Sequence, residues 1–446
     1  MNNKQGKVYV VHHIDTEGPL YESLEALFER LNNVFEIQLE PSLKNLSLIK
    51  TNKLSFGQEK DLEIKQFLDS HLSNYIDNWH DLEQMINKVS SPNFRNKFKD
   101  SNVKGWVFNW HVMDHVGFSN DNPRRRTYGF NSIYNFYEKL VQNQDPKIDS
   151  LHWHFHPISF SKSAHIPATS YDNSMKILHE IISRRLIDKN NFPVVNRAGF
   201  HTVRFDSNLF LEQWMPFDAS NQAIKEQPKF QKDLINGRYG DWRGAPDDWS
   251  IYNPSFNDWR KSGNLKRSIS RVLNLKARHR EITKQEIEIA FKRAKEGENV
   301  YLGVTNHDWR DMHPELLHFR SLLSKVSAKF KNIDFIHSEA VDAFRGCLNF
   351  DETMISQDKI DLSIELNNNI IQVDIINGEI FGPQPYLAIK TKEGKYLHDN
   401  FDFGIKEKQF LYTFDEYTIP LEQISKLTVA SNDKYGNTCI KKLKLN

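Results

Sequence analysis

The feature of this chain that most constrains its fold is the recurrence of short, β-rich runs with helical segments between them. Because strands that alternate with helices form parallel sheets, this pattern predicts an α/β protein. About seven such units are enough to close a barrel, so we expect a (β/α)7 barrel. The runs that we interpret as its strands are Val8–Asp15, Trp106–Met113, Ser150–His156, Val194–Phe200, Trp214–Ser220, Val300–His307 and Ile333–Ser338.

Two of the intervening helices carry clear start signals. Thr283 and Glu286 form a capping box ahead of an amphipathic run that stops at Gly297. Pro314 opens a second run, ELLHFRSLLSKVSAKF, in which apolar residues recur at helical spacing. Both helices lie between late strands, as the alternation requires.

The length of the chain predicts two domains. At 446 residues it exceeds what one hydrophobic core fills, since domains run to about 100–200 residues and barrels to roughly 250. We assign residues 1–350 to the barrel, with long insertions at about 20–104, mostly helical, and 221–280, rich in Trp, Asp, Arg and Pro. After Phe350 the chain changes to period-two segments separated by turn signals, which predicts an antiparallel β-sandwich over 351–446.

Composition excludes several classes of protein. The net charge of +1 provides no field that would recruit nucleic acid, and no segment approaches the ~20 apolar residues that span a bilayer. The two cysteines, Cys347 and Cys439, are too few for a disulfide framework. The N-terminal residues do not resemble a signal peptide, so we expect a cytoplasmic protein. Histidine is the informative excess, with 18 residues, many of them where strands should end.

The run LHWHFHP at 151–157 carries the sharpest sign of chemistry. In a strand, side chains at i and i+4 lie about 13 Å apart and cannot share an ion. In a turn at the end of the strand, the same spacing brings His152 and His156 close enough to chelate one metal, and Pro157 favours that turn. The alternative is that these histidines are stacked in the core or on the surface.

Further polar residues lie at the ends of other expected strands. Asp15 and Glu17 follow the first strand, where one acid can ligate a cation while the other takes a proton from water, or both can serve a helix N-terminus. Arg197 ends another strand and, if buried, needs a carboxylate partner such as Asp15. His307 can donate a proton to a leaving group or simply pack, and Asp218 can orient a histidine. Barrel enzymes build their sites on this face, so the series favours catalysis.

The motifs HHIDTEG, HWHFHP, NRAGFH, FDAS and GVTNH occur in the order found in the NodB-like polysaccharide deacetylases. The chain resembles that family over about residues 8–340. The resemblance implies a distorted (β/α) barrel with fewer than eight strands, in agreement with the seven runs. It also implies that Glu17, His152 and His156 bind one divalent ion, for which zinc is the expected metal.

The same resemblance implies a set of catalytic roles. Asp15 would be the general base, held ionised and aligned by Arg197, and His307 would be the general acid, tuned by Asp218. Two departures bear on these roles. Trp153 stands where the family has Ser or Thr, and Thr16 separates acids that are adjacent in the commoner motif. The second departure leaves open which of Asp15 and Glu17 is the base.

By this resemblance the chain would hydrolyse N-acetyl or other N-acyl groups on a sugar or glycan, in surface-polysaccharide or O-antigen lipopolysaccharide biosynthesis. We expect His154, and Trp242, Arg243 and Asp248 of the second insertion, to contact the substrate through aromatic faces and polar groups. The aromatic residues of that insertion can equally form its own core. Two other functions stay open: a metal-dependent amidohydrolase acting on a small amide, and a carbohydrate-binding protein on an inactive deacetylase scaffold.

Overall fold

The computed structural model describes residues 5–115, 130–144, 148–156, 171, 174–225, 240–277, 279–405 and 408–445. Within these residues, seven parallel strands close into a barrel, because β1 pairs with both β7 and β2. The fold is therefore the α/β barrel that the alternation predicts. The strands of the ring are β1 (Val8–Thr16), β2 (Asn109–His115), β3 (Ser150–His156), β4 (Val195–Ala198), β5 (Phe217–Asn221), β6 (Ser268–Asn274) and β7 (Val300–His307).

Strand β1 is the centre of the sheet. It pairs with β7 from Val8 to Asp15, and with β2 only at its carboxyl end, from His13 to Thr16. At its amino end the same edge pairs instead with β8 (Phe335–His337). Almost every residue of β1 is buried, as expected for a parallel strand that is covered on both faces. The barrel therefore closes at the carboxyl ends of β1 and β2, where the candidate site lies.

The number of strands in the ring matches the prediction, but one predicted strand lies outside the ring and one strand of the ring was not predicted. Residues 333–338, expected as a barrel unit, form the short strand β8 beside the ring. Residues 268–274, placed in the second insertion, form the barrel strand β6. Polar residues on both faces of β6 conceal it in the sequence: Ser270 is buried, and the buried Arg271 binds Glu286.

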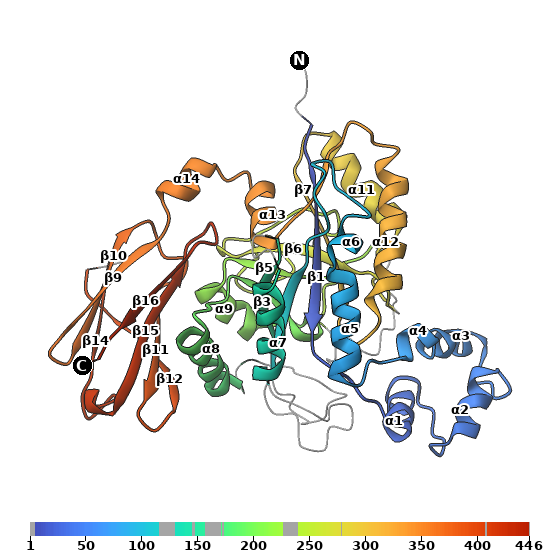
Figure 1. The fold of residues 1–446 in the computed structure, drawn as a ribbon, viewed down its shortest axis with the longest axis horizontal. Helices are drawn as coiled ribbons and strands as arrows, with labels where there is room; N and C mark the ends of the chain where they lie inside the picture. The colour runs from blue at the N-terminus through green and yellow to red at the C-terminus, as the bar shows by residue number, and fades with distance from the viewer. Residues whose placement is uncertain are drawn as a thin grey trace.

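Helices cover the outside of the barrel (Figure 1). Helix α11 is capped by Thr283, whose side chain accepts from the Glu286 amide, as predicted, but the Glu286 carboxylate binds Arg271 and does not complete the predicted capping box. Helix α12 begins two residues before Pro314, because Asp311 caps it. The helices of this layer are α7 (Phe130–Gln142), α8 (Met175–Lys189), α9 (Phe205–Trp214), α11 (Lys284–Lys295) and α12 (Met312–Ser327). Helix α13 (Ala340–Cys347) instead packs against the apolar cluster inside the barrel, through Ala340, Ala343 and Phe344.

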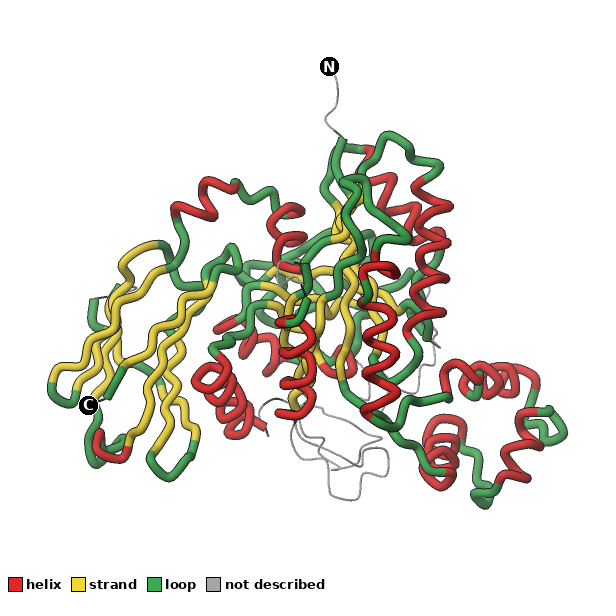
Figure 2. The backbone as a smooth tube through the Cα atoms, viewed as in Figure 1, coloured by secondary structure: helices red, strands yellow, loops and turns green. Residues whose placement is uncertain are grey.

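The insertion before β2 is helical, as expected. Its first helices form a lobe with a separate apolar core that includes Phe28, Leu31 and Phe67, and this lobe projects to one side of the barrel (Figures 1 and 2). Leu82 and Ile86 of α5, in contrast, belong to the core of the barrel. The helices are α1 (Leu24–Phe35), α2 (Leu43–Lys50), α3 (Gln58–Phe67), α4 (Ser70–Ser73), α5 (Trp79–Ser90) and α6 (Pro92–Arg95).

After α14 (Glu352–Gln357) the chain forms two four-stranded antiparallel sheets that share one apolar core (Figure 2). The second sheet also packs against helix α8 of the barrel, through Tyr386 and Tyr396. The first sheet contains β9 (Asp361–Asn367), β10 (Ile370–Asn377), β13 (Asp402–Phe403) and β14 (Gln409–Thr413). The second contains β11 (Tyr386–Thr391), β12 (Tyr396–Asp399), β15 (Ile424–Asn432) and β16 (Thr438–Leu443).

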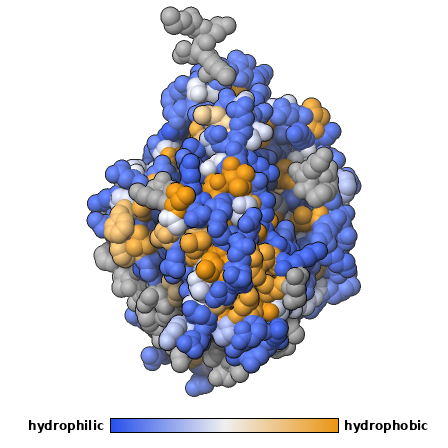
Figure 3. Space-filling model, turned by 90° about the vertical axis from the view of Figure 1, so that its left-hand side faces the viewer, coloured by the Kyte–Doolittle hydropathy of each residue, from blue (hydrophilic) through white to orange (hydrophobic). Residues whose placement is uncertain are grey.

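The surface on the side of these sheets is mostly hydrophilic, with separate hydrophobic patches (Figure 3). Strand β10 shows the expected alternation, since Ile371 and Val373 are buried while Ile370 and Ile376 are exposed.

Among the helices that the structure describes, none has the length and apolar character needed to cross a membrane.

Two stacked histidines lie where α8 meets the second sheet. The rings of His179 and His398 are 4.3 Å apart and nearly parallel, and His398 also stacks on Tyr386 at 4.1 Å. His398 donates from Nδ1 to the Leu387 carbonyl at 2.9 Å. Burial lowers the pKa of His179 to about 3 and that of His398 to about 4, so both rings are neutral in the folded protein.

We therefore expect acid to destabilise this contact. The unfolded chain binds a proton at His398 near pH 6.5, whereas the folded chain does so only near pH 4, so stability is lost as the pH falls through this window. The loss for one such ring is about 2 kcal/mol by pH 5. The thermal midpoint, measured from pH 8 to pH 5, should fall less steeply in His398→Phe than in the unchanged protein. The exposed His80→Gln should not alter the slope, and equal slopes for His398→Phe and the unchanged protein would contradict the assignment.

Candidate metal centre

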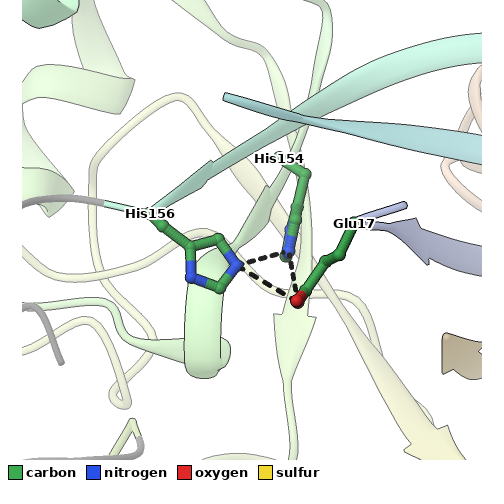
Figure 4. A group of neighbouring side chains, drawn as sticks. All are labelled: Glu17, His154 and His156. Carbon is green, nitrogen blue, oxygen red and sulfur yellow. Dashed lines mark hydrogen bonds and ion pairs between the residues drawn. The ribbon is translucent and has the colours of Figure 1, made fainter. Parts of the chain in front are cut away.

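The site is built from the carboxyl ends of four barrel strands. Strand β3 remains extended through His156, so His152, His154 and His156 all face the same side, into the barrel. Glu17 follows β1, and its carboxylate meets the last two of these histidines at the mouth (Figure 4). The expected turn at the end of β3 is therefore absent up to His156, and Pro157 lies outside the described residues.

Three side chains converge with the geometry of a metal site. Nε2 of His156 lies 2.9 Å from Nε2 of His154 and 3.4 Å from Oε1 of Glu17. Nε2 of His154 lies 3.9 Å from the same Glu17 oxygen, and all three ligand atoms fall within 4.8 Å of one another (Figure 4). Two imidazoles and one carboxylate are a donor set that zinc accepts, with positions left for water or substrate. The group fits one divalent ion.

The hydrogen bond of His154 orients this ligand. Its Nδ1 lies 2.7 Å from the carbonyl oxygen of Arg197, and a carbonyl can only accept, so Nδ1 carries the hydrogen. Nε2 of the neutral ring then presents its lone pair to the cluster, which is how protein environments orient histidine ligands. Burial disfavours a charged ring, but Asp15 and Glu17 outweigh it and raise the pKa of His154. A proton and a metal ion therefore compete for Nε2.

His152, expected as a metal ligand, lies apart from this cluster. Its Nε2 is 2.9 Å from Oε1 of Glu339 and 3.0 Å from Oγ of Ser150. The proposed pairing of His152 with His156 needed a turn, whereas β3 stays extended and separates the two rings. The structure instead brings His154, expected as a substrate contact, together with His156. Among the described residues, the group that could hold a metal ion is therefore Glu17, His154 and His156.

Arg197 and Asp15 form the predicted ion pair. Nε of Arg197 donates to Oδ1 of Asp15 at 2.5 Å, and both side chains are almost completely buried. The guanidinium also donates to the Ala219 carbonyl at 2.8 Å and to Nδ1 of His201 at 3.1 Å. Burial raises the pKa of Asp15, but Arg197, followed by His154 and His307, overcomes that effect and holds it below its ordinary value. Asp15 is therefore ionised.

His307 lies beside both acids at the end of β7. Its Nε2 is 3.9 Å from Oδ2 of Asp15 and 3.8 Å from Oε1 of Glu17. Burial lowers the pKa of His307 to about 4, against the attraction of Asp15 and Glu17. The ring is therefore neutral at neutral pH, and its position allows it to exchange a proton with a group bound between these carboxylates.

The structure does not bring Asp218 to His307. Asp218 lies 3.4 Å from Nε of Arg267 and accepts from Asn196 at 3.0 Å. Its neighbours in β5, Phe217 and Ala219, belong to the interior cluster, so the alternation of the strand directs Asp218 to the outer face. The expected tuning of His307 by this residue has no contact to support it.

The three expected substrate contacts of the second insertion are also placed elsewhere. Trp242 is fully buried, and its indole donates to the carbonyl of His201 at 2.8 Å. Arg243 is exposed and pairs with Asp241. Asp248 is exposed and binds Arg293, near the end of α11 where the chain enters the amino end of β7. Trp242 thus belongs to an apolar cluster that the insertion forms with Ala198 and Val203.

Three residues near the centre, Phe200, His201 and Trp309, were not predicted as site residues from the sequence. The half-buried ring of Phe200 lies 4.7 Å from that of His156, and the ring of Trp309 lies 4.8 Å from that of His307. Phe200 belongs to the motif NRAGFH, and Trp309 follows the motif GVTNH by two residues, so their position near a candidate site residue was the available signal. His201, the third of these residues, accepts a hydrogen bond from the Arg197 guanidinium.

The backbone beneath His156 is tightly constrained. A Cβ atom at Gly199 would lie 2.6 Å from Cδ2 of His156, so only glycine fits without moving the ligand. The next two residues, Phe200 and His201, have positive φ angles of 53° and 55°. Such conformations are costly for residues with side chains and persist where the surrounding structure holds them.

The chain was compared with protein-family models, with curated proteins and with solved structures, and none of these comparisons gives a match.

The ion pair predicts a strong dependence of stability on both partners. Arg197→Met should lower the free energy of unfolding by about 3–5 kcal/mol, because it leaves a buried carboxylate without its cation. Asp15→Asn leaves the opposite charge, whereas the double variant removes both and should cost less than the two single losses combined. Urea denaturation of the unchanged protein, the two single variants and the double variant measures these losses in the free energy of unfolding. Strictly additive losses would show that the two side chains are not coupled.

Proposed function

We propose that this chain is a metal-dependent hydrolase that removes N-acyl groups from a sugar or glycan. The observation that carries the proposal is the convergence of Glu17, His154 and His156 with Asp15 and His307 at one end of a parallel barrel. The motif order, which resembles that of the NodB-like polysaccharide deacetylases, supports the same reaction. In the proposal His154 takes the ligand position that the resemblance gave to His152.

Glu17, His154 and His156 would hold the ion, for which zinc is the expected metal. When bound there, a divalent ion supplies a Lewis acid that lowers the pKa of a water molecule and polarises the acyl carbonyl. The side chains around the ion would position the reacting groups and move the proton. Arg197 keeps Asp15 in place, and the Arg197 carbonyl keeps the Nδ1 hydrogen of His154 away from the cluster.

Asp15 and His307 would move the proton. Arg197 binds Oδ1 of Asp15, and Oδ2 lies on the side of His307, at 3.9 Å from its Nε2. We assign Asp15 to remove the proton of the attacking water, as a general base. Because His307 starts neutral, the proton that it delivers to the departing amine has to come from that water by way of Asp15. An amine leaves readily only once it is protonated, so this transfer completes the hydrolysis.

The aromatic residues around the centre favour a substrate with an apolar face. Phe200 and Trp309 are partly exposed and lie against His156 and His307, respectively. Such rings can pack against the C–H face of a pyranose while the polar groups engage its acyl substituent. By the family resemblance, N-acetylated sugars of surface polysaccharides and O-antigens are the first substrates to test. A small non-glycan amide would use the same chemistry.

Metal binding provides the most direct test of the centre. Isothermal titration with Zn²⁺ should give one site per chain in the unchanged protein. His154→Ala and His156→Ala should weaken binding by more than about 100-fold, since each removes a ligand atom, whereas even an outer-shell change costs about 10- to 100-fold. His152→Ala should retain the affinity and serves as the matched control. Loss of zinc in His152→Ala with retention in His154→Ala would contradict the ligand assignment.

Acyl release tests the reaction itself. The zinc-loaded protein should release acetate from at least one N-acetylated sugar, nucleotide-sugar or glycan, and a chelator should abolish the release. Asp15→Asn should reduce the rate by about 100- to 10,000-fold, because the general base is lost. Release only from small non-glycan amides would favour the amidohydrolase alternative. A protein that binds zinc but cleaves no amide of either kind would overturn the proposed reaction.

A further inference from the structure

Asp308, the residue after His307, is a buried acid that neither the motifs nor the proposed reaction uses. Its side chain is completely buried. Oδ1 accepts the backbone N–H of Glu17 at 2.8 Å, and Oδ2 accepts that of Gly18 at 2.9 Å. The hydroxyl of Tyr137, on helix α7, also donates to Oδ2 at 2.8 Å. Both oxygens of Asp308 are therefore directed at the backbone that carries Glu17.

These contacts fix the point where the chain leaves β1. The strand ends at Thr16, and Gly18 has a φ of 71°, so the backbone turns sharply directly after Glu17. A Cβ atom at Gly18 would lie 3.3 Å from Trp79 and 3.4 Å from Ile133, which shows how closely the turn is packed. One carboxylate thus binds two consecutive N–H groups of a turn that regular pairing with β7 does not reach, since that pairing ends at Asp15.

Asp308 also connects this turn to the end of β7, where the proposed acid His307 lies. It follows His307 directly in the chain, so the same residue that binds the backbone of Glu17 fixes the end of β7. His307 and Glu17 face each other across 3.8 Å. A shift of the turn would therefore change the distance between the Glu17 carboxylate and both His156 and His307.

We infer that Asp308 is a positioning residue, which sets the Glu17 carboxylate against the two histidine ligands by binding the backbone amides of Glu17 and Gly18. The inference rests on the proposed function, because it assigns a role within the same metal centre. Asp308 does not belong to the group that could hold the ion, and its two oxygens face the two amides and the Tyr137 hydroxyl. Its effect reaches the ion only through Glu17.

The test is a zinc titration of Asp308→Asn at pH 7.5. The substitution keeps the size of the side chain but replaces one acceptor oxygen with an NH2 group, which cannot accept from a backbone amide. We expect the zinc Kd to rise by about 10- to 100-fold, the usual cost of losing a group that orients a ligand. Tyr137→Phe removes the third hydrogen bond and leaves both amide contacts, so its Kd should stay close to that of the unchanged protein.

Asp100 supplies a matched control at the other end of the barrel. It is buried and accepts the backbone N–H groups of Asn102, Lys104 and His337, at 2.9, 2.8 and 3.0 Å. Asp100→Asn should therefore lower the thermal midpoint as a comparable loss of backbone contacts does, without changing the zinc Kd. This comparison separates a positioning role from general destabilisation.

The outcomes are distinct. Zinc binding that is equal in Asp308→Asn and the unchanged protein would overturn the inference and leave the metal centre standing. Equal weakening in Asp308→Asn and Asp100→Asn would also overturn it, by showing a loss of stability only. Absence of zinc binding in the unchanged protein would overturn the proposed centre and the positioning role together. If Asp308→Asn does not fold, Asp308→Ser, which leaves room for a water at the amides, replaces it in the same titration.

Discussion

The buried ion pair between Arg197 and Asp15 is the interaction on which the rest of the site depends. Neither charge could be buried alone, because an unpaired ion inside a protein costs several kcal/mol. The pair is tolerated because the guanidinium also binds the Ala219 carbonyl and His201, so that each of its three nitrogens has a hydrogen-bond partner. These bonds join β1, β4 and β5 across the mouth of the barrel. The carbonyl of the same arginine orients His154, so one residue positions both the proposed base and a candidate metal ligand.

A second polar network fills the barrel beneath the site. Nδ1 of His111 lies 3.1 Å from the Trp153 carbonyl, which can only accept, so His111 donates there. Burial lowers the pKa of His111 and His13 far below the ordinary value, and each neutral ring therefore carries one hydrogen. It follows that His13 donates to Nε2 of His111 at 2.8 Å and accepts from the Tyr301 hydroxyl at 3.0 Å. Among the described histidines, some rings therefore lie in the candidate centre, whereas others, such as His13 and His111, bond to each other in the core of the barrel.

The sequence predicted the fold class and much of the site for identifiable reasons. Strands β3 and β7 have the predicted bounds, because they are continuous runs with clear ends, and the contact of Arg197 with Asp15 follows from the need of a buried guanidinium for a carboxylate. Strand β6 was missed because its buried Arg271 conceals an apolar pattern. Asp218 was assigned to the site because its position in the chain does not reveal which face of β5 it occupies. The family assignment and the reaction stay predictions.

The tilt of the strands in a barrel explains why His154, and not the expected His152, lies in the candidate metal group. Along the hydrogen-bonded rows, Asp15 is the partner of His111, and His111 is the partner of His152. Yet the imidazole that lies 3.7 Å from Asp15 is that of His154, two residues further along β3. Strands of a closed barrel are inclined to its axis, with a stagger of about one residue for each strand crossed. From β1 to β3 two strands are crossed, so the residue of β3 that lies level with Asp15 is two positions further along than its partner in the hydrogen-bonded rows. A pattern confined to one strand, such as the spacing of His152 and His156, carries no information about that stagger, which exists only once the ring is closed.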